Sequence, residues 1–170
     1  QLDEKEDYNE IIFHVKFNEN DATLQQETLG SLGVHLIYGA YNLSDNPRKL
    51  IESLYDDIST DDVEIDMIDF SGPAFTYVDN RLMSLQLVKN GMTDAVIFNP
   101  EGNNMLPADI LYKKNIFAVR GSFRPVTLVN IDMFERGLEM FMKDSCCSFE
   151  ETVVLFEITI SNLRASGDID

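Results

Sequence analysis

The fold prediction starts from residues 63–98, which read VEIDMIDFSGPAFTYVDNRLMSLQLVKNGMTDAVIF. Apolar and acidic residues alternate over 63–70, which predicts a β-strand with one face in water. A helix is expected over 79–90, with an Asp as its cap and Gly91 directly after it. Residues 94–98 are a short apolar run of the kind buried in a parallel sheet. The stretch therefore predicts a strand–helix–strand unit.

The alternation of strands and helices extends to both sides of this unit. Further strand-like apolar runs occur over 11–17, 34–38, 116–120 and 152–160. Further helical patterns occur within 20–32, over 47–60, over 107–114 and from Asn130 onward. About six strands alternating with five helices predict an α/β domain with a Rossmann-like, open and mostly parallel sheet flanked by helices.

Length and charge limit the class of protein. The chain has 170 residues, 44% of them apolar, which suits one globular domain. We expect a single domain over 11–165 after a disordered acidic edge over 1–10, and we expect the chain to be a fragment of a longer protein. The formal net charge is −17 at pH 7. Because so acidic a chain repels phosphate backbones and anionic lipid heads, we expect neither nucleic acid nor a membrane among its partners.

The apolar runs and the cysteines indicate the compartment. No apolar run approaches the roughly 18 residues that a membrane-spanning helix needs. The two cysteines, Cys146 and Cys147, are adjacent in the sequence and cannot join distant segments. We expect two reduced thiols and a cytoplasmic location.

The charge balance reverses in one window. Residues 110–131 contain no Asp or Glu, and they hold Lys113, Lys114, Arg120 and Arg124. The basic residues surround a loop at a predicted strand end, where open α/β sheets bind their ligands. Gly121 permits close backbone approach, Ser122 offers a hydroxyl, and two guanidinium groups suit a phosphate or carboxylate. One interpretation is an anion pocket, and the other is that the arginines pair with the surplus carboxylates of the domain.

A second candidate site lies at the end of the 63–70 strand. Asp69 begins the stretch Asp69-Phe-Ser-Gly-Pro73 at this strand end, so its carboxylate is a candidate catalytic acid or base, or a ligand for Mg²⁺. The alternative is that Asp69 caps the turn. Asn80 follows the cap of the 79–90 helix, where backbone N–H groups attract anions, so it is a candidate for ligand binding. Helix capping alone also explains this position.

Three segments, 79–88, 91–96 and 111–127, resemble a group of longer bacterial proteins. These proteins occur in cyanobacteria and in Bacteroidetes-type bacteria and carry the name nicotinate-nucleotide adenylyltransferase. The resemblance covers most of residues 10–165 and implies that the chain is the N-terminal or middle part of a longer, nucleotide-processing protein. Adenylyltransferases of the nucleotidyl-transferase class hold the triphosphate with an H-x-G-H signature, whereas the two histidines of this chain are isolated.

Two functions follow from these observations. The first is the binding or conversion of an anionic small molecule, either a nucleotide or a phosphorylated metabolite, by Asp69, Asn80 and the basic residues of 110–131. The alternative is a non-catalytic interaction domain that assembles a homo-oligomer. In that case Arg120 and Arg124 bridge to carboxylates of a partner chain or of the domain itself.

Overall fold

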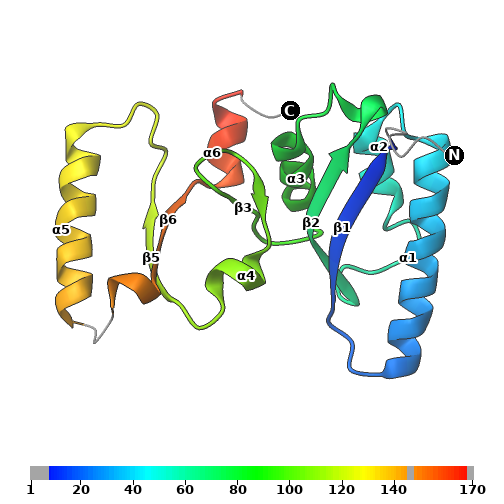
Figure 1. Cartoon of the computed structure of the whole chain (residues 1–170), viewed down its shortest axis with the longest axis horizontal. Helices are drawn as coiled ribbons and strands as arrows, with labels where there is room; N and C mark the ends of the chain where they lie inside the picture. The colour runs from blue at the N-terminus through cyan, green and yellow to red at the C-terminus, as the bar shows by residue number, and fades with distance from the viewer. Residues whose placement is uncertain (1–7, 145–147, 168–170) are drawn as a thin grey trace, which may run out of the picture. The chain divides into compact units, whose positions relative to one another are not determined.

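The computed structural model of the chain describes residues 8–144 and 148–167 (Figure 1). The chain divides into two units, Gln1–Leu106 and Pro107–Asp170, and each is described by itself. This division does not test the expected single domain over 11–165, which stays a prediction. The two adjacent cysteines and most of the acidic edge over 1–10 lie outside the described residues.

Unit 1 is built on an antiparallel pair of strands. β1 (Glu10–Phe17) pairs with β2 (Val63–Ser71), and the register shifts at a bulge beside His14 and Val15. A bulge inserts one extra residue on one strand and changes which side chains face inward. Val63 and Ile65 are buried before the bulge, whereas Ile68 and Phe70 are buried after it. The bulge therefore keeps apolar side chains in the core although the spacing along β2 changes by one residue.

Three helices cover the inner face of this sheet. They are α1 (Ala22–Asn42), α2 (Pro47–Ser53) and α3 (Asn80–Lys89), and a short 3₁₀ turn, η1 (Pro73–Phe75), precedes α3. The side chains of Asp21, Asn46 and Asp79 accept hydrogen bonds from the first backbone N–H groups of these helices. The core contains Leu32 of α1, Leu50 and Ile51 of α2, and Met83 and Leu87 of α3, packed against β2.

On the edge of β2 that does not pair with β1, only some backbone groups form hydrogen bonds with another backbone segment. The backbone N–H of Ile65 donates to the Met92 carbonyl at 3.1 Å. Beyond that point the chain forms a short antiparallel pair, β3 (Ile97–Phe98) with β4 (Asn104–Met105). The connecting loop, 99–103, lies beside α3 and contributes to the site described below.

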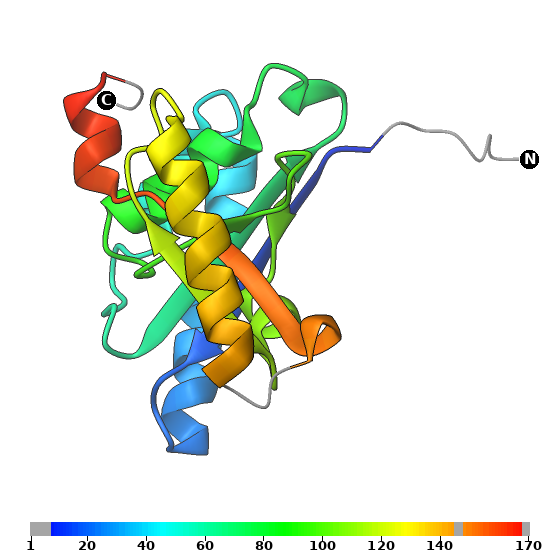
Figure 2. The same cartoon turned by 90° about the vertical axis from the view of Figure 1, so that its left-hand side faces the viewer.

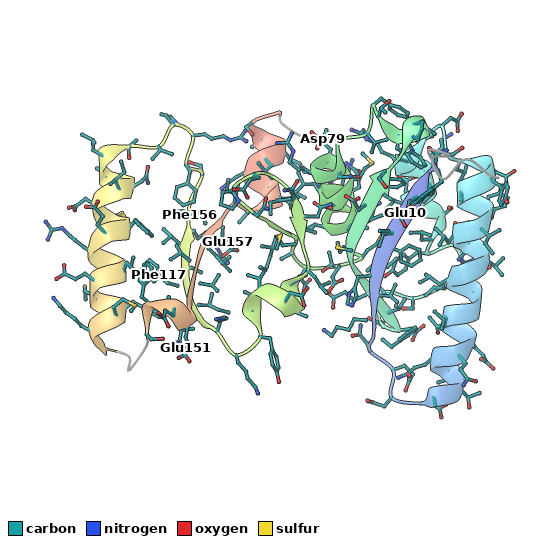
Figure 3. The ribbon with its side chains drawn as sticks, in the orientation of Figure 1. Glu10, Asp79, Phe117, Glu151, Phe156 and Glu157 are labelled. Atoms are coloured by element: carbon teal, nitrogen blue, oxygen red, sulfur yellow. The ribbon has the colours of Figure 1, made fainter. Side chains whose placement is uncertain are left out.

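Unit 2 contains one parallel pair of strands and one long helix. β5 (Asn115–Arg120) pairs with β6 (Thr152–Glu157), and α5 (Leu128–Asp144) lies across them (Figure 2). Phe117 and Phe156 point from the strands toward α5, where both contact Phe134 (Figure 3). The remaining elements are α4 (Pro107–Leu111), η2 (Phe149–Glu151) and α6 (Ile160–Ala165). No described residue of unit 2 is fully buried. The aromatic cluster of Phe117, Phe134 and Phe156 therefore serves as the partly buried core of this unit.

The predicted Rossmann-like sheet of about six mostly parallel strands is wrong. The described residues form a mixed α/β structure with three separate two-stranded sheets, of which only β5–β6 is parallel. Residues 34–38 are not a strand, because they continue α1, whose core-facing residues Leu32, Leu36 and Gly39 follow helical spacing. In 94–98 only Ile97 and Phe98 are extended, and they pair antiparallel.

Among the described helices, none combines the length and the apolar character that crossing a bilayer requires.

Candidate functional site

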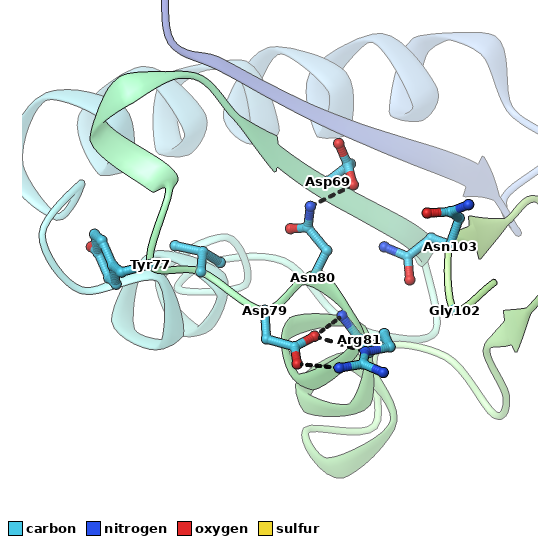
Figure 4. A pocket seen from close by; sticks show the side chains of 9 residues that line it. Asp69, Tyr77, Asp79, Asn80, Arg81, Gly102 and Asn103 are labelled. Carbon is cyan, nitrogen blue, oxygen red and sulfur yellow. Dashed lines mark hydrogen bonds and ion pairs between the residues drawn. The ribbon is translucent and has the colours of Figure 1, made fainter.

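An open, polar pocket of about 590 Å³ lies in unit 1, beside the end of β2 and the start of α3 (Figure 4). The wall comes from three places: the end of β2, the turn that leads into α3, and the loop between β3 and β4. The lining residues are Asp69, Tyr77, Val78, Asp79, Asn80, Arg81, Gly102, Asn103 and Asn104. Two residues predicted from the sequence, Asp69 and Asn80, thus meet in one place.

Asp69 is the partly buried acid of this pocket. Its Oδ1 accepts a hydrogen bond from Asn80 Nδ2 at 2.7 Å. Burial raises the pKa of the Asp69 carboxyl above its usual value, and the nearby charge of Glu10 raises it further. A partly desolvated carboxylate held by one amide can accept a proton or a hydroxyl hydrogen bond.

The side chain of Asn80 is engaged on all sides by β2. Its Oδ1 accepts from the backbone N–H of Phe70 at 2.9 Å, and its Nδ2 donates to the Phe70 carbonyl at 3.0 Å as well as to Asp69. The amide thus satisfies the strand edge, as a neighbouring backbone would. Asn80 therefore acts first as the residue that orients Asp69, and its predicted role in ligand binding stays a prediction.

Asn104 supports the same edge from the other side of the pocket. Its Nδ2 donates to the Ile68 carbonyl at 2.8 Å. Its Oδ1 is buried and has no hydrogen-bond partner among the described residues. Two side-chain amides, from α3 and from β4, thus replace a third strand along the end of β2.

Asp79 and Arg81 supply the other charges of the pocket. Asp79 accepts from the Arg81 backbone N–H at 3.0 Å, and it binds the guanidinium through Nε at 3.1 Å and Nη2 at 2.8 Å. The hydrogen bonds from Arg81 hold the pKa of Asp79 below its usual value. The Arg81 stem lies against Gly102, where an added Cβ would sit 3.3 Å from its Cδ. With Asp69, Asp79 and Arg81 ionised, these three groups sum to a charge of −1.

The basic residues predicted to clamp an anion belong to unit 2, and none of them lines the pocket. Arg120 Nη2 lies 2.6 Å from Glu157 Oε1, so this guanidinium has a carboxylate partner. Lys114 donates to the Glu150 carbonyl at 3.2 Å, and Lys113 Nζ lies 5.0 Å from the centre of the Tyr112 ring.

The loop that follows β5 is a folded turn. The backbone N–H of Gly121 donates to the Glu157 carbonyl at 3.1 Å, which extends the β5–β6 ladder by one residue. Phe123 has a positive φ of 52° and packs edge-on against Phe156, with ring centres 5.3 Å apart. Ser122 and Arg124 are exposed on either side of it. The ligand-binding roles of Gly121, Ser122 and Arg124 stay predictions.

The described residues assemble no metal centre. Within residues 8–144 and 148–167, no three His, Cys, Asp or Glu side chains gather as metal ligands. His14 Nδ1 lies 2.7 Å from Asp66 Oδ1, which is a pair and not a larger cluster. Mg²⁺ therefore stays a prediction that rests on Asp69.

Sequence reasoning did not single out Tyr77, Gly102, Asn103 or Asn104. The 99–106 loop is recognisable as one that follows an apolar run, and its Asn-Asn pair is the available signal. The distance of this loop from Asp69 along the chain hides the connection, because tertiary contacts bring them together: Asn104 binds the Ile68 carbonyl of β2, and Gly102 lies against Arg81 of α3.

Comparisons with protein-family models, with curated proteins and with solved structures give no match to this chain. The resemblance to bacterial proteins that carry the adenylyltransferase name therefore stays a prediction. The functional argument rests on the site itself.

Proposed function

We propose that the chain binds a small hydroxylated molecule in the pocket beside β2, and that this ligand is a nucleotide or a phosphorylated metabolite held through its sugar hydroxyls. The observation that carries the proposal is the Asp69 carboxylate, which is partly buried and aligned by Asn80 at 2.7 Å. A carboxylate in such a setting is a strong acceptor for a hydroxyl proton.

The remaining lining supports a polar ligand. Carboxylates, amides and a guanidinium dominate the pocket, and Val78 is its single aliphatic residue. Asn103 is exposed, and its side chain has no hydrogen bond to another described residue. The Tyr77 side chain is 63% exposed and offers a ring face for a sugar or a base. The lining thus suits a ligand with several hydroxyls and one flat, apolar face.

The charge of the pocket determines where a phosphate binds. Because Asp79 already holds Arg81 at two points, a phosphate reaches the guanidinium only by taking the place of that carboxylate. The sugar hydroxyls have no such competitor at Asp69. We therefore propose that the sugar gives most of the affinity and that the phosphate adds less than an uncommitted arginine would provide.

The predicted catalytic role of Asp69 is a further part of the proposal. A carboxyl group with a raised pKa is suited to take or give a proton at a bound hydroxyl. We also propose a cytoplasmic location, supported by the adjacent cysteines and by the class of ligand. The net charge of −17 supports the absence of nucleic acid among the partners.

The test is a thermal-shift and calorimetric titration with ribose 5-phosphate, ribose, adenosine monophosphate and inorganic phosphate, with and without Mg²⁺. We expect ribose 5-phosphate to stabilise the wild type more than inorganic phosphate does. Asp69→Asn keeps the shape and removes the charge, and we expect it to weaken binding by about tenfold, the loss of one charge-assisted hydrogen bond. The matched control is Asp57→Asn, an exposed position outside the pocket. Equal binding by the two variants would place the ligand elsewhere.

A further inference from the structure

α1 has an apolar face that the rest of unit 1 leaves uncovered. The helix lies alongside β1 and uses Leu32, Leu36 and Gly39 for the core (Figure 1). On another side, Val34, Ile37, Tyr38 and Tyr41 are exposed by 64%, 61%, 56% and 85%. Their spacing of i, i+3, i+4 and i+7 places them in one stripe. Large apolar side chains gathered in one exposed stripe mark a surface that binds a partner, so this stripe calls for an occupant.

The stripe lies in a window without charge. Residues 28–44 contain no Asp, Glu, Lys or Arg, although a quarter of the chain is charged and about four such residues are expected in 17. Two copies of a chain with a net charge of −17 repel each other at long range. A surface through which they can associate must therefore keep carboxylates apart, and the α1 stripe does so.

The side chains of the stripe also vary in size so that two copies of it can fit together, a small residue facing a large one. Gly30 lies one turn before Val34, and a Cβ added to it meets no described atom within 4 Å. An antiparallel, two-fold pairing centred between His35 and Leu36 sets Gly30 of one copy opposite Tyr41 of the other. The same pairing sets Val34 opposite Ile37. Two-fold interfaces require that each residue meet its counterpart reciprocally, and this register gives a large ring a small neighbour at both ends.

We propose that the α1 stripe, Gly30, Val34, Ile37, Tyr38 and Tyr41, binds the same stripe of a second copy in an antiparallel helix pair. This inference is independent of the ligand pocket, which lies on other elements. A lipid surface is a poorer occupant, because helices that lie on membranes carry Lys and Arg on their polar face and α1 has neither. A single helix pair buries less than a standard interface, so we expect a dissociation constant on the order of micromolar or weaker.

Sedimentation equilibrium of the full chain between about 5 and 500 μM tests the proposal. We expect the wild type to pass from monomer to dimer over this range, and Ile37→Glu to remain monomeric because it places two carboxylates near the two-fold axis. The matched control is Val129→Glu, at a similarly exposed apolar position on α5. A monomeric wild type at every concentration, or equal dimerisation by Ile37→Glu and wild type, would overturn the proposal.

Two further measurements test the register and the driving force. Gly30→Leu adds apolar surface but fills the space for Tyr41 of the partner copy, so we expect it to weaken the dimer at least tenfold. If the chains associated by nonspecific hydrophobic contact, the added leucine would strengthen the dimer instead. Raising the salt concentration screens the repulsion between acidic copies, so we expect the wild-type dimer to tighten. A dimer that loosens with salt is held by ion pairs, such as the alternative role of Arg120 and Arg124, and would contradict an apolar α1 interface.

Discussion

The side chain of Asn80 pairs with the backbone of Phe70 as a neighbouring strand would. The Phe70 N–H donates to Asn80 Oδ1 at 2.9 Å, and Asn80 Nδ2 donates to the Phe70 carbonyl at 3.0 Å. The same Nδ2 reaches Asp69 Oδ1 at 2.7 Å. One residue thus ends the sheet edge, begins α3 and orients the acid of the proposed binding pocket.

Removing the amide should destabilise unit 1. Asn80→Ala leaves the N–H and carbonyl of Phe70 without these partners, and we expect a loss of about 2 kcal/mol in the free energy of unfolding. Urea unfolding followed by circular dichroism measures it. Asn103→Ala is the control, because this exposed side chain has no hydrogen bond to another described residue and its loss should cost about 0.5 kcal/mol or less. Equal losses in both variants would show that the Asn80 amide does not support β2.

Asp69 should make stability depend on pH on the acid side. Its folded pKa is raised above the unfolded value of 3.8 by burial and by Glu10. The folded chain therefore holds this proton more tightly, so the contribution to stability is present below about pH 3.8 and is lost as the pH rises through the folded pKa. In Asp69→Asn this loss should disappear, and urea unfolding between pH 3 and 7 measures the change. An unchanged pH dependence would mean that Asp69 is not desolvated.

Gly72 should not tolerate a side chain. Its φ is +104°, and an added Cβ would clash with the Tyr8 carbonyl oxygen and lie 2.7 Å from Asn9 Cα. Gly91 also has a positive φ, +72°, but an added Cβ there meets no described atom within 4 Å. We expect a loss of about 3 kcal/mol for Gly72→Ala and about 1 kcal/mol for Gly91→Ala, because backbone strain acts in both and the clash in one. Similar losses would show that the chain before β1 does not pack on Gly72.

Tyr55 should contribute to the pH dependence of the free energy of unfolding above pH 10. Its hydroxyl donates to the Val63 carbonyl at 2.7 Å, and burial raises its pKa from 10.0 to about 12. The unfolded chain gives up this proton first, so stability falls as the pH rises from 10 toward 12. Tyr55→Phe should lose about 1 kcal/mol at neutral pH but show a shallower fall above pH 10. Tyr112→Phe, at an exposed position outside both proposed binding surfaces, should keep the wild-type slope.

Local sequence patterns correctly predict the elements whose boundaries depend on residues close by in the sequence. β1, β2 and α3 follow the predicted ranges closely, because alternation marks the strands and Asp79 caps the helix. The Met67-Ile68 step breaks the alternation just after the bulge, whose extra residue on β2 is Asp66, so this irregularity has a signal nearby in the sequence. Strand pairing has no such local signal, and the prediction of a parallel sheet rests on the order of the elements alone.

α1 is an element whose extent the local sequence pattern predicts wrongly. Residues 34–38 are rich in β-branched and aromatic side chains, and Gly33 resembles a helix end, yet the helix continues through both. Packing of Leu32, Leu36 and Gly39 on the core outweighs these weak preferences. The candidate site likewise contains residues that the local sequence indicates and residues that it does not. Asp69 was recognisable at a strand end, whereas Asn103 and Asn104 join it only through tertiary packing.

The measurement that tests the proposed pocket most directly is a titration of the ¹⁵N-labelled chain with ribose 5-phosphate, followed by two-dimensional NMR. We expect saturable shifts in the backbone amides of Asn80, Arg81 and Gly102 and in the side-chain amide of Asn103, and we expect these shifts to be lost in Asp69→Asn. Shifts centred on Gly121, Ser122 and Arg124, with the pocket signals unmoved, would contradict the proposal and return the anion site to the basic loop.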